Sequence, residues 1–600
     1  MDPTDTTDDM PSNDIGQALP ERALSQAMEL ITARDENTYE ASRSARDRQI
    51  YSTLSIKAAR KIYGKELSDK ATRDELITCI EKDVWECLDP TYVTKNAIPS
   101  RMFLTPKTLP NGELDRVKGR IVAGGHKQDR SLYEDKEISS PTVALTSVLT
   151  MAALAAHEGR HVMTLDHKAA YLNASMQGAP VEMLIPAEVA EILCDIDVKY
   201  RKFLRHDKKI AVKLKKALYG CVQSAVLWYN ELTATLEHLG FTRNPYDICS
   251  FSRPHTGSYD RILVYVDDLF LTSDSQDRLK AIAGVLQSKY DAVTFKLGLE
   301  HDFLGIHWDF SVPGQTSLSM DGYINNIIQK YQVMKQCSTP ATDRLFHTTP
   351  DSPPLTSDNR ESFRSCVMTL YYLAKRTMPQ ILAAISYCTT RILGPTLEDQ
   401  KKLDRILSYV LYSKSRPMIL RIGTNLQLRA FVDASFGLYE DGKSVTGVVI
   451  MLGDATIYVK SGKQKIVTRS STESELVGVS DSLSQVLWTR EYLASAGLEL
   501  GPALMFQDNQ STIFLATKGR STSERSRHIK IRHFFVSHYI DANEIKIEYL
   551  PTGEMIADIL TKPLHGTLFS RLCAKLTGDL RNLSNSLPII IPKAQWSKAN

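Results

Sequence analysis

The feature that most constrains the fold of this chain is a pair of adjacent aspartates between two apolar runs. Residues 262–271 read Ile-Leu-Val-Tyr-Val-Asp-Asp-Leu-Phe-Leu, so Asp267 and Asp268 interrupt a β-like stretch. Apolar and aromatic runs on both sides of two polar residues are typical of a β-hairpin with the polar pair at its tip. A simple Asp-Asp turn on the surface explains this segment equally well when it is taken alone. The pair therefore predicts a hairpin and leaves its function open.

A third carboxylate stands at the end of an apolar run further upstream. Residues 164–173 read Thr-Leu-Asp-His-Lys-Ala-Ala-Tyr-Leu-Asn, in which the acid is Asp166. Carboxylates from separate strand ends can converge on two divalent ions about 3.5 to 4 Å apart, which stabilise the attacking and leaving oxygens of a phosphoryl displacement. Magnesium suits such a site because it takes one or two carboxylates plus phosphate oxygens. Asp166, Asp267 and Asp268 are thus candidate ligands of two Mg²⁺ ions, with Mn²⁺ as the alternative metal.

The C-terminal third of the chain contains a second set of acids. Asp433 lies inside the apolar run at residues 431–434, where an unpaired carboxylate would be costly without a cation. Three segments further along supply more acids, the candidates being Glu475, Asp508 and Asp558. A second metal-binding cluster is the expectation from this pattern.

The motifs closely resemble those of the reverse transcriptases of copia-type retrotransposons. Residues 265–268 (Tyr-Val-Asp-Asp) resemble the family's catalytic hairpin, and residues 165–173 resemble its first carboxylate motif. Residues 214–229 resemble the nucleotide-binding segment around a glutamine, and residues 118–125 resemble a basic strand pair that contacts the incoming triphosphate. Residues 303–306 resemble the primer-gripping hairpin, and the order of the motifs is that of the family.

The resemblance implies roles in DNA synthesis. Asp166 and Asp267 would hold the ions, with Asp268 supporting them. Tyr171 would lie beneath the sugar and exclude a 2′-OH, the group that distinguishes ribonucleotides from deoxyribonucleotides. The alternative for Tyr171 is an aromatic residue of the core. The remaining substrate contacts implied are Gln223 to the base pair or sugar and Lys118 and Arg120 to the phosphates, each with an ordinary surface role as the alternative.

The second acid set resembles the ribonuclease H of the same family, with Asp433, Glu475, Asp508 and Asp558 as its four metal-binding acids. Glu473 is the competing residue, and we prefer Glu475 because it directly precedes the apolar Leu476, as in the family pattern. Within the basic segment at residues 525–533, His528 would help to position substrate or release product. A packing or hydrogen-bonding histidine is the alternative there.

The resemblance, from about residue 55 to 565, implies an α+β fold: a right-hand polymerase with fingers, palm and thumb, then a helical connection and an α/β ribonuclease H-like domain. The expected divisions are residues 1–50 as a disordered acidic leader, 51–310 as fingers and palm, 311–425 as a helical thumb and connection, 426–565 as the ribonuclease H domain and 566–600 as a C-terminal tail. The Pro-, Ser- and Thr-rich segment at residues 338–357 predicts a mobile linker.

Composition limits the classes of protein that remain. Hydrophobic residues make up 42% and charged residues 24% of 600 residues, and no apolar run is long enough for a membrane helix. No signal or transit peptide is readable, and nine cysteines without a Cys-x-x-Cys pair argue against a disulfide framework and a structural zinc site. We therefore expect an intracellular protein without a membrane partner. The resemblance implies a cytoplasmic virus-like particle, the nucleus or both as its location.

The partners that the resemblance implies are an RNA template, a DNA primer, the RNA–DNA hybrid, deoxynucleoside triphosphates, and the integrase and capsid proteins of the same element. A degenerate or domesticated copy that binds nucleic acid without catalysis is the main alternative. The presence of acids at all seven metal-binding positions favours an enzyme. A functional ribonuclease H joined to a silent polymerase is a third alternative, which separate assays of the two activities would distinguish.

Overall fold

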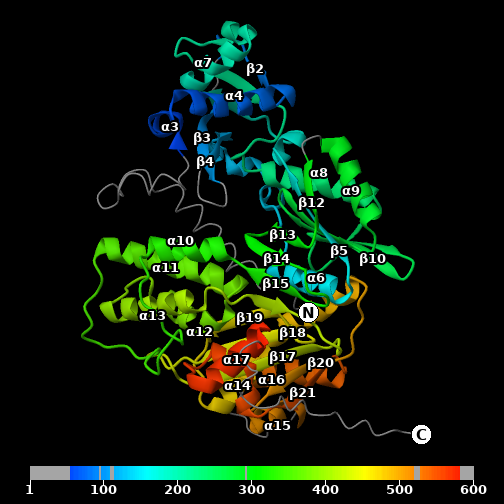
Figure 1. Ribbon diagram of the computed structural model, residues 1–600, viewed down its shortest axis with the longest axis vertical. Coiled ribbons are helices and arrows are strands. Elements are labelled where there is room, and N and C mark those ends of the chain that lie inside the picture. Colours follow the sequence, from blue (N-terminus) through cyan, green and yellow to red (C-terminus); the bar gives the residue numbers. More distant parts are fainter. Residues whose placement is uncertain (1–53, 93–95, 109–113, 291–292, 519–526, 581–600) are drawn as a thin grey trace, which may run out of the picture. The chain divides into compact units, whose positions relative to one another are not determined.

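The structure is a computed structural model that describes residues 54–92, 96–108, 114–290, 293–518 and 527–580 (Figure 1). The chain divides into two compact units, Met1–Arg130 with Met176–Val222, and Ser131–Ser175 with Gln223–Asn600. The acidic leader predicted for residues 1–50 lies outside the described residues. Across the described ranges, no helix has both the length and the apolar character needed to cross a membrane.

The first unit is built on a six-stranded sheet with helices against it. Its elements are β1 (Leu54–Ser55), α3 (Ile56–Tyr63), α4 (Lys65–Glu81), β2 (Trp85–Cys87), β3 (Ile98–Thr108), β4 (Leu114–Ala123), β6 (Glu182–Ile185), α7 (Ala187–Ile196) and β7 (Ile210–Leu214). The strand order is β1-β3-β6-β7-β2, and β4 pairs with β3 as a hairpin. Gly119 of β4 lies so close to α4 that an added Cβ would be 2.5 Å from the carbonyl oxygen of Ala71. A larger residue at this position would push the helix off the strand.

The second unit begins with an antiparallel sheet, called here the central sheet. Its strands and helices are α6 (Leu145–His157), β5 (His161–His167), α8 (Ser224–His238), β8 (Thr242–Arg243), β9 (Ser250–His255), β10 (Ser258–Tyr265), β11 (Asp268–Ser273), α9 (Gln276–Tyr290) and β12 (Val293–Gly298). The strand order is β12-β5-β11-β10-β9-β8. Strands β10 and β11 form the predicted hairpin, and β5 is the predicted strand that carries Asp166. The apolar runs of all three strands are buried in this sheet.

A mainly helical region follows the central sheet. Its elements are β13 (Glu300–Phe303), β14 (Ile306–Asp309), β15 (Thr316–Ser319), α10 (Asp321–Lys330), α11 (Ser357–Arg376), α12 (Leu382–Arg391), α13 (Leu397–Ser413) and β16 (Met418–Leu420). The four strands form one antiparallel sheet. The Thr-x-x-Asp pattern at residues 396–399 predicts a helix start, and in the structure Thr396 and Asp399 form a capping box at the first turn of α13.

The segment predicted to be a linker packs instead against its neighbours. Ala341, Leu345 and Leu355 within it are buried, and Pro354 forms an isolated β-bridge with Thr396. Well-spaced apolar side chains anchor the segment although Pro, Ser and Thr dominate its composition. The prediction of a free linker at residues 338–357 is therefore wrong.

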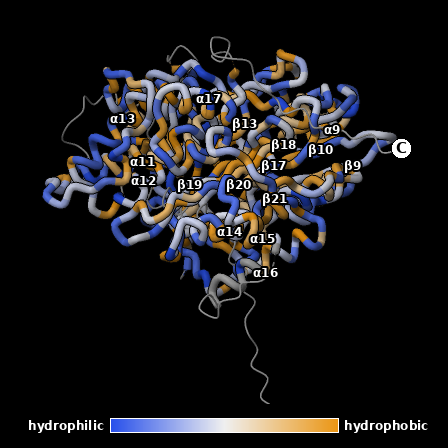
Figure 2. The backbone as a smooth tube through the Cα atoms, turned by 90° about the horizontal axis from the view of Figure 1, so that it is seen from below, coloured by the Kyte–Doolittle hydropathy of each residue, from blue (hydrophilic) through white to orange (hydrophobic). Residues whose placement is uncertain are grey.

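The C-terminal sheet has five strands in the order β19-β18-β17-β20-β21. Its elements are β17 (Leu428–Ser435), β18 (Val445–Leu452), β19 (Ala455–Lys463), α14 (Ser471–Ser495), β20 (Ala503–Gln507), α15 (Gln510–Lys518), α16 (Arg527–Asp541), β21 (Ile545–Tyr549) and α17 (Gly566–Thr577). Strands β17, β18 and β19 are antiparallel, whereas β20 and β21 run parallel to β17. Hydrophobic residues are concentrated along β17, β18 and β20 (Figure 2), and all eight residues of β18 are buried.

The C-terminal tail predicted for residues 566–600 begins with the packed helix α17, so that part of the prediction is wrong. Phe569, Leu572 and Leu576 are buried, and the ring of Phe569 lies 5.8 Å from that of Tyr409 on α13. Their spacing of three and four residues is the period of one helix face. The end of this helix is bonded to the first residues of β19, where Thr456 donates a hydrogen bond of 2.8 Å to the carbonyl of Leu576.

Helix α14 of the C-terminal region also packs against the central sheet. The Nδ2 of Asn244 donates to the carbonyl of Tyr492 at 2.9 Å, and the hydroxyls of Ser250 and Tyr492 lie 3.0 Å apart. The indole of Trp488 donates to the carbonyl of Tyr246 at 3.0 Å. Residues from the predicted palm and the predicted ribonuclease H domain thus share one interface, which lies within the second unit.

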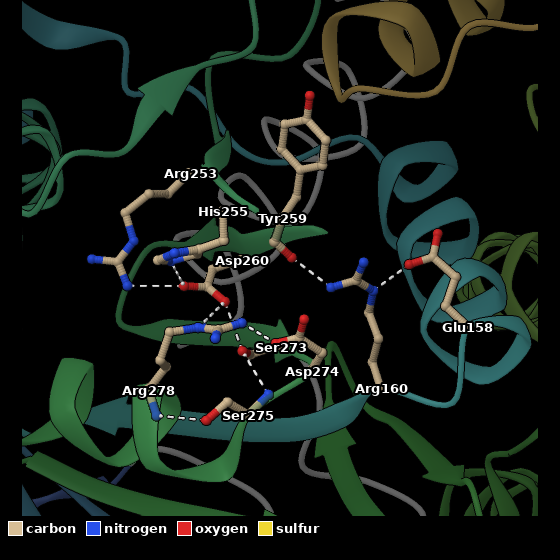
Figure 3. Close-up of polar contacts among 10 residues, drawn as sticks. All are labelled: Glu158, Arg160, Arg253, His255, Tyr259, Asp260, Ser273, Asp274, Ser275 and Arg278. Carbon is tan, nitrogen blue, oxygen red and sulfur yellow. Dashed lines mark hydrogen bonds and ion pairs between the residues drawn. The ribbon is translucent and has the colours of Figure 1, made fainter. Parts of the chain in front are cut away.

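The end of the β10–β11 hairpin away from the aspartate turn is held by a network around Asp260 (Figure 3). The Asp260 side chain is almost fully buried and accepts hydrogen bonds from Arg253 (2.9 Å), His255 (2.8 Å), Ser273 (2.6 Å) and Arg278 (3.1 Å). These partners lie on β9, on β11 and on α9. One carboxylate therefore ties three strands and a helix together at the base of the hairpin.

Asp260→Asn is expected to destabilise the second unit by about 3 kcal/mol at pH 7, because it removes the buried charge that the half-buried guanidinium groups of Arg253 and Arg278 pair with. Burial alone would raise the pKa of Asp260, but hydrogen bonds from Ser273, Arg253 and Arg278 outweigh it and lower the pKa. The stabilisation is therefore complete above the unfolded-state pKa of about 3.9 and is lost as the pH falls through the lower folded-state pKa. Thermal unfolding from pH 7 to pH 3 should show the two proteins converging in acid.

The matched control is Asp274→Asn, which removes a half-exposed partner of the same Arg278. An exposed ion pair contributes at most about 1 kcal/mol, so this variant should unfold close to the unaltered protein. Equal losses in the two variants would argue against a special role for the buried carboxylate.

Candidate active sites

The three predicted polymerase carboxylates lie together at one edge of the central sheet. Asp268 is the first residue of β11 and pairs directly with Asp166 of β5, and Asp267 precedes it in the turn. Burial, followed by the charges of Asp267 and Asp166, raises the pKa of Asp268 to about 7. Three acids in mutual electrostatic contact at strand ends are the arrangement that the sequence led us to expect.

The turn that carries them is tight and strained. Tyr265 pairs with Asp268, which leaves Val266 and Asp267 as a two-residue turn. Val266 has a φ of +56°, in the left-handed region that a β-branched residue rarely adopts. A backbone of this kind costs of order 1 to 3 kcal/mol and persists only where the surroundings hold it.

Residues from two other elements hold this turn. The indole of Trp228 on α8 donates to the carbonyl of Val266 at 2.6 Å, and the amide of His167 donates to the carbonyl of Asp267 at 3.0 Å. The rings of His167, Trp228 and Tyr290 pack edge to face, with centroids 5.2 to 5.5 Å apart. Burial lowers the pKa of His167 to about 4, so its imidazole is neutral at pH 7. His167 and Trp228 both lie within motifs identified in the sequence, but the sequence did not predict that they hold this turn.

Tyr171 lies just beyond Asp166, where the chain reverses. Ala169 has a φ of +54°, and the 3-10 helix η3 (Ala170–Asn173) then contacts α8. The Tyr171 side chain is only half-buried, whereas Ala170 and Leu172 on either side are buried. A partly exposed ring five residues after Asp166 is a better candidate for a substrate contact than a fully buried core aromatic would be.

The other predicted nucleotide contacts differ in their accessibility. Gln223 at the start of α8 is buried and donates a hydrogen bond of 3.3 Å to the hydroxyl of Tyr133, so it could touch a nucleotide only after moving. Lys118 and Arg120 lie two residues apart on β4 and are half-buried, with the guanidinium of Arg120 over the ring of Tyr219. These two basic residues belong to the first unit, whereas the carboxylates belong to the second.

The second cluster gathers all four predicted acids around the C-terminal sheet. Asp433 is on β17 and Asp508 follows β20, each two residues beyond the paired Phe431 and Phe506 of these parallel strands. Asp558 lies in the 3-10 helix η8 (Ile556–Leu560). One carboxylate oxygen from each of Asp433, Asp508 and Asp558 lies within 4.8 Å of the others, a spacing that could hold a metal ion.

Glu475 on α14 completes this cluster. Burial, followed by the charges of Asp433 and Asp508, raises the pKa of Glu475 to about 9, and the Nε2 of Gln507 donates to its carboxyl at 3.2 Å. Glu473 serves a different purpose, because its carboxylate accepts from the backbone amide of Arg469 at 2.8 Å at the N-terminus of α14. The geometry therefore favours Glu475 over Glu473 as a metal ligand.

Two residues that the sequence reasoning did not single out contact the same acids. The amine of Lys562 donates to Asp558 at 2.8 Å and to Asp433 at 3.2 Å, and the hydroxyl of Thr561 donates to Asp433. Burial alone would lower the pKa of Lys562, but the charges of Asp433 and Asp558 outweigh it and raise the pKa. The signal was present in the sequence as a lysine four residues after Asp558.

The predicted contact at His528 falls on α16, but its side chain lies outside the described residues. In the same helix, Arg532 pairs with Asp481 on α14. The basic segment at residues 525–533 is therefore only partly described.

The second cluster has the spacing of a divalent-metal site, because it is the one group among the described residues that brings three carboxylate oxygens within 4.8 Å of one another. The three polymerase acids offer the same kind of ligand without that spacing in this structure. Carboxylate oxygens are hard donors that suit Mg²⁺ or a similar ion. Asp433, Glu475 and Asp558 are buried at 1%, 6% and 2% exposure, so their mutual repulsion without a cation is large. Burial and the neighbouring acids raise the pKa values of Asp268, Glu475 and Asp558, which means that the charged form of each carboxyl is disfavoured.

The sequence of residues 82–343 matches the family "Reverse transcriptase (RNA-dependent DNA polymerase)". The chain is 29% identical over 511 residues to the "Retrovirus-related Pol polyprotein from transposon RE1" of Arabidopsis thaliana, which covers 84% of this chain and 33% of that protein. It is 23% identical to the "Transposon Ty1-BL Gag-Pol polyprotein" of Saccharomyces cerevisiae, over 86% of this chain and 29% of that protein. The chain thus spans about a third of the length of these relatives.

Among solved structures, the N-terminal ribonuclease H domain of a Mycobacterium tuberculosis protein aligns with 23% of this chain and 91% of that chain. The alignment has 14% identity and a TM-score of 0.17. A score of this size supports no conclusion about the fold.

Proposed function

The chain belongs to the copia-type retrotransposon polyproteins and carries a reverse transcriptase domain over residues 82–343, and from this we propose that it is an RNA-directed DNA polymerase with ribonuclease H activity. The observation that carries the polymerase assignment is the direct pairing of Asp166 with Asp268, beside Asp267 in its strained turn. All three acids lie within the matched residues. The first unit then corresponds to the fingers, the central sheet to the palm and the helices after it to the thumb and connection.

In DNA synthesis, Asp166 and Asp267 hold the metal ions and Asp268 supports them. Two bound Mg²⁺ ions, with Mn²⁺ as the alternative, would stabilise the attacking and leaving oxygens of the phosphoryl transfer. The chain's own contribution is to fix the carboxylates through Val266, Trp228 and the neutral His167, which limits reorganisation during the reaction. Lys118 and Arg120 bind the triphosphate, and Gln223, once it leaves its buried position beside Tyr133, contacts the base pair or sugar.

For RNA cleavage, Asp433, Glu475, Asp508 and Asp558 form the second metal site, outside the residues that match the family. The convergence of four acids with two raised pKa values supports this assignment. The same two-metal chemistry, run toward hydrolysis, would cut the RNA strand of a hybrid. His528 is retained as a residue that positions substrate or releases product.

The proposed substrates are an RNA template, a DNA primer, deoxynucleoside triphosphates and the RNA–DNA hybrid. Integrase and capsid proteins of the same element are the proposed partners, in a cytoplasmic virus-like particle, in the nucleus or in both. The deciding experiment is primer extension with Mg²⁺ on the purified chain, with hybrid cleavage measured separately. A chain that binds nucleic acid but performs neither reaction would be a domesticated binding protein, and the proposal would be wrong.

Tyr171→Val is expected to raise incorporation of ribonucleotides relative to deoxyribonucleotides. If the ring fills the space beneath C2′, its removal abolishes the clash with a ribose hydroxyl, so kcat/KM for ribonucleotides rises. A tenfold change in the ratio corresponds to about 1.4 kcal/mol. Single-nucleotide incorporation with both sugars measures the effect.

Tyr409→Val is the matched control, because Tyr409 is a fully buried tyrosine on α13, outside the proposed nucleotide contacts, whose hydroxyl lies 3.8 Å from the Sγ of Cys573. Its truncation should lower stability by roughly 2 to 5 kcal/mol through the cavity it leaves, without changing sugar choice. If Tyr171→Val behaves in the same way, with lower stability and unchanged selectivity, the sugar gate is refuted.

A further inference from the structure

The amine of Lys562 occupies the position between two acids of the proposed ribonuclease H site. It lies 2.8 Å from an oxygen of Asp558 and 3.2 Å from an oxygen of Asp433, the two most buried aspartates of the cluster. Thr561, the preceding residue, donates to the other oxygen of Asp433. Both oxygens of Asp433 and one oxygen of Asp558 therefore already accept hydrogen bonds from the chain itself.

We propose that Lys562 is a resident counter-ion of this cluster: its ammonium stabilises the metal-free site and competes with the divalent ion that Asp433 and Asp558 share. The inference rests on the proposed ribonuclease H function and assigns to Lys562 a role in setting the metal affinity of that site. Lysine suits this role because its charge is a compact point at the end of a flexible stem.

The surroundings of Lys562 allow the amine to leave. The side chain keeps 34% of its surface exposed, so an amine displaced by a metal can turn toward solvent rather than into the core. Asp558 precedes it by four residues, and the 3-10 helix η8 ends between them. The backbone amide of Lys562 donates to the carbonyl of Asp558 at 2.9 Å, so only the lysine side chain needs to move. Asp433, by contrast, is fixed within β17. The acids can stay in place while the lysine moves.

If the Lys562 ammonium competes with the metal, the direction in which its removal changes metal affinity can be predicted. An ammonium bonded to both acids must be displaced, or its attraction lost, before a divalent ion can use the same oxygens. Removing the charge should therefore weaken the metal-free fold and tighten metal binding. A lysine that merely packs, or one that helps to hold the ion, would give the opposite or no change in affinity.

The test compares Lys562→Met with the unaltered residue in the full chain, using Mn²⁺ as the probe. Both proteins also carry Asp267→Asn, so that the second cluster dominates the titration. Calorimetric Mn²⁺ titration at constant pH should give binding about tenfold or more tighter for Lys562→Met, since the methionine keeps the stem and removes only the competing charge. Thermal unfolding with EDTA should show the variant melting lower, with a larger rise on adding Mn²⁺.

Two further variants make the result specific. Lys562→Arg keeps the charge and should bind Mn²⁺ within a few-fold of the unaltered protein. Lys575→Met removes a lysine of α17 that pairs with Glu554 in the same region, and should leave Mn²⁺ affinity unchanged. Unchanged or weaker binding by Lys562→Met would overturn the proposal.

Folding failure is also informative. A Lys562→Met chain that unfolds in EDTA but folds with Mn²⁺ supports the counter-ion role, whereas one that folds under neither condition shows that the amine is needed for packing and refutes it. Hybrid cleavage is measured in the chain with Asp267 and Lys562 intact. If that chain does not cut hybrids, the proposed function fails, while the Mn²⁺ titration still decides the role of Lys562.

Discussion

Asp267→Asn is expected to slow DNA synthesis by on the order of a thousandfold or more while leaving hybrid cleavage largely intact. Loss of a direct metal ligand removes several kcal/mol of transition-state stabilisation, and each 1.4 kcal/mol is about tenfold in rate. Cleavage persists because the acids of the second cluster are a separate set on another sheet. Primer extension and hybrid cleavage, assayed on one preparation, measure both effects.

The control for this prediction is Asp277→Asn, an exposed aspartate in the first turn of α9 of the same region. It should extend primers at the normal rate, so that a loss confined to Asp267→Asn reports the site. Near-normal extension by Asp267→Asn would refute the polymerase assignment. A loss of both activities would mean instead that the strained turn affects the whole second unit.

Glu475→Gln is expected to give the mirror result, with hybrid cleavage lowered about a thousandfold or more and primer extension preserved. The fold should tolerate the change well. Because burial raises the pKa of Glu475 to about 9, this carboxyl is already neutral at pH 7 without a metal, and an amide resembles that neutral form. Thermal unfolding in EDTA should therefore show no loss of stability.

Glu473→Gln is the matched control two residues away. Its carboxylate caps the amide of Arg469, and an amide oxygen can accept the same hydrogen bond, so cleavage should stay near normal. If Glu475→Gln still cuts RNA while Glu473→Gln does not, the ligand assignment is reversed. If both cut, another acid performs the role.

The parts of the fold that were predictable from sequence are those that depend on short patterns. The alternation of apolar runs with two acids predicted the β10–β11 hairpin, and the capping pattern at Thr396 predicted the start of α13. Which strands pair with each other was harder to predict, because no short sequence pattern indicates that Asp268 lies opposite Asp166. The chemistry of a two-metal site suggested that juxtaposition and the resemblance added to it, and the register of β5 with β11 agrees with it.

The missed features are of two kinds. Helix α17 was overlooked although Phe569, Leu572 and Leu576 show a helical period, so a closer reading of the sequence would have found it. The prediction for residues 338–357 was wrong because a high content of Pro, Ser and Thr indicates only which backbone conformations are favoured. It does not show that Ala341, Leu345 and Leu355 are buried against neighbouring elements.

Other missed features depend on contacts between distant residues. Asp260 is one acid among many in the sequence, and only the folded sheet brings two arginines, a histidine and a serine to it. Lys562 was visible as a lysine after Asp558, but its second partner, Asp433, lies far away along the chain. The strain at Val266 likewise depends on Trp228 holding the turn.

The packing of α14 against the central sheet affects how copies of the retrotransposon that encodes this chain can lose their activities. One helix carries Glu475 near its start and, through Trp488 and Tyr492, contacts Tyr246 and Ser250 on the β9 side of the central sheet. A substitution that loosens this contact would disturb both activities at once, so selection cannot act on either one alone at these positions. We expect copies that lose one activity to do so at the acids themselves, and copies that lose both together to carry changes along this helix.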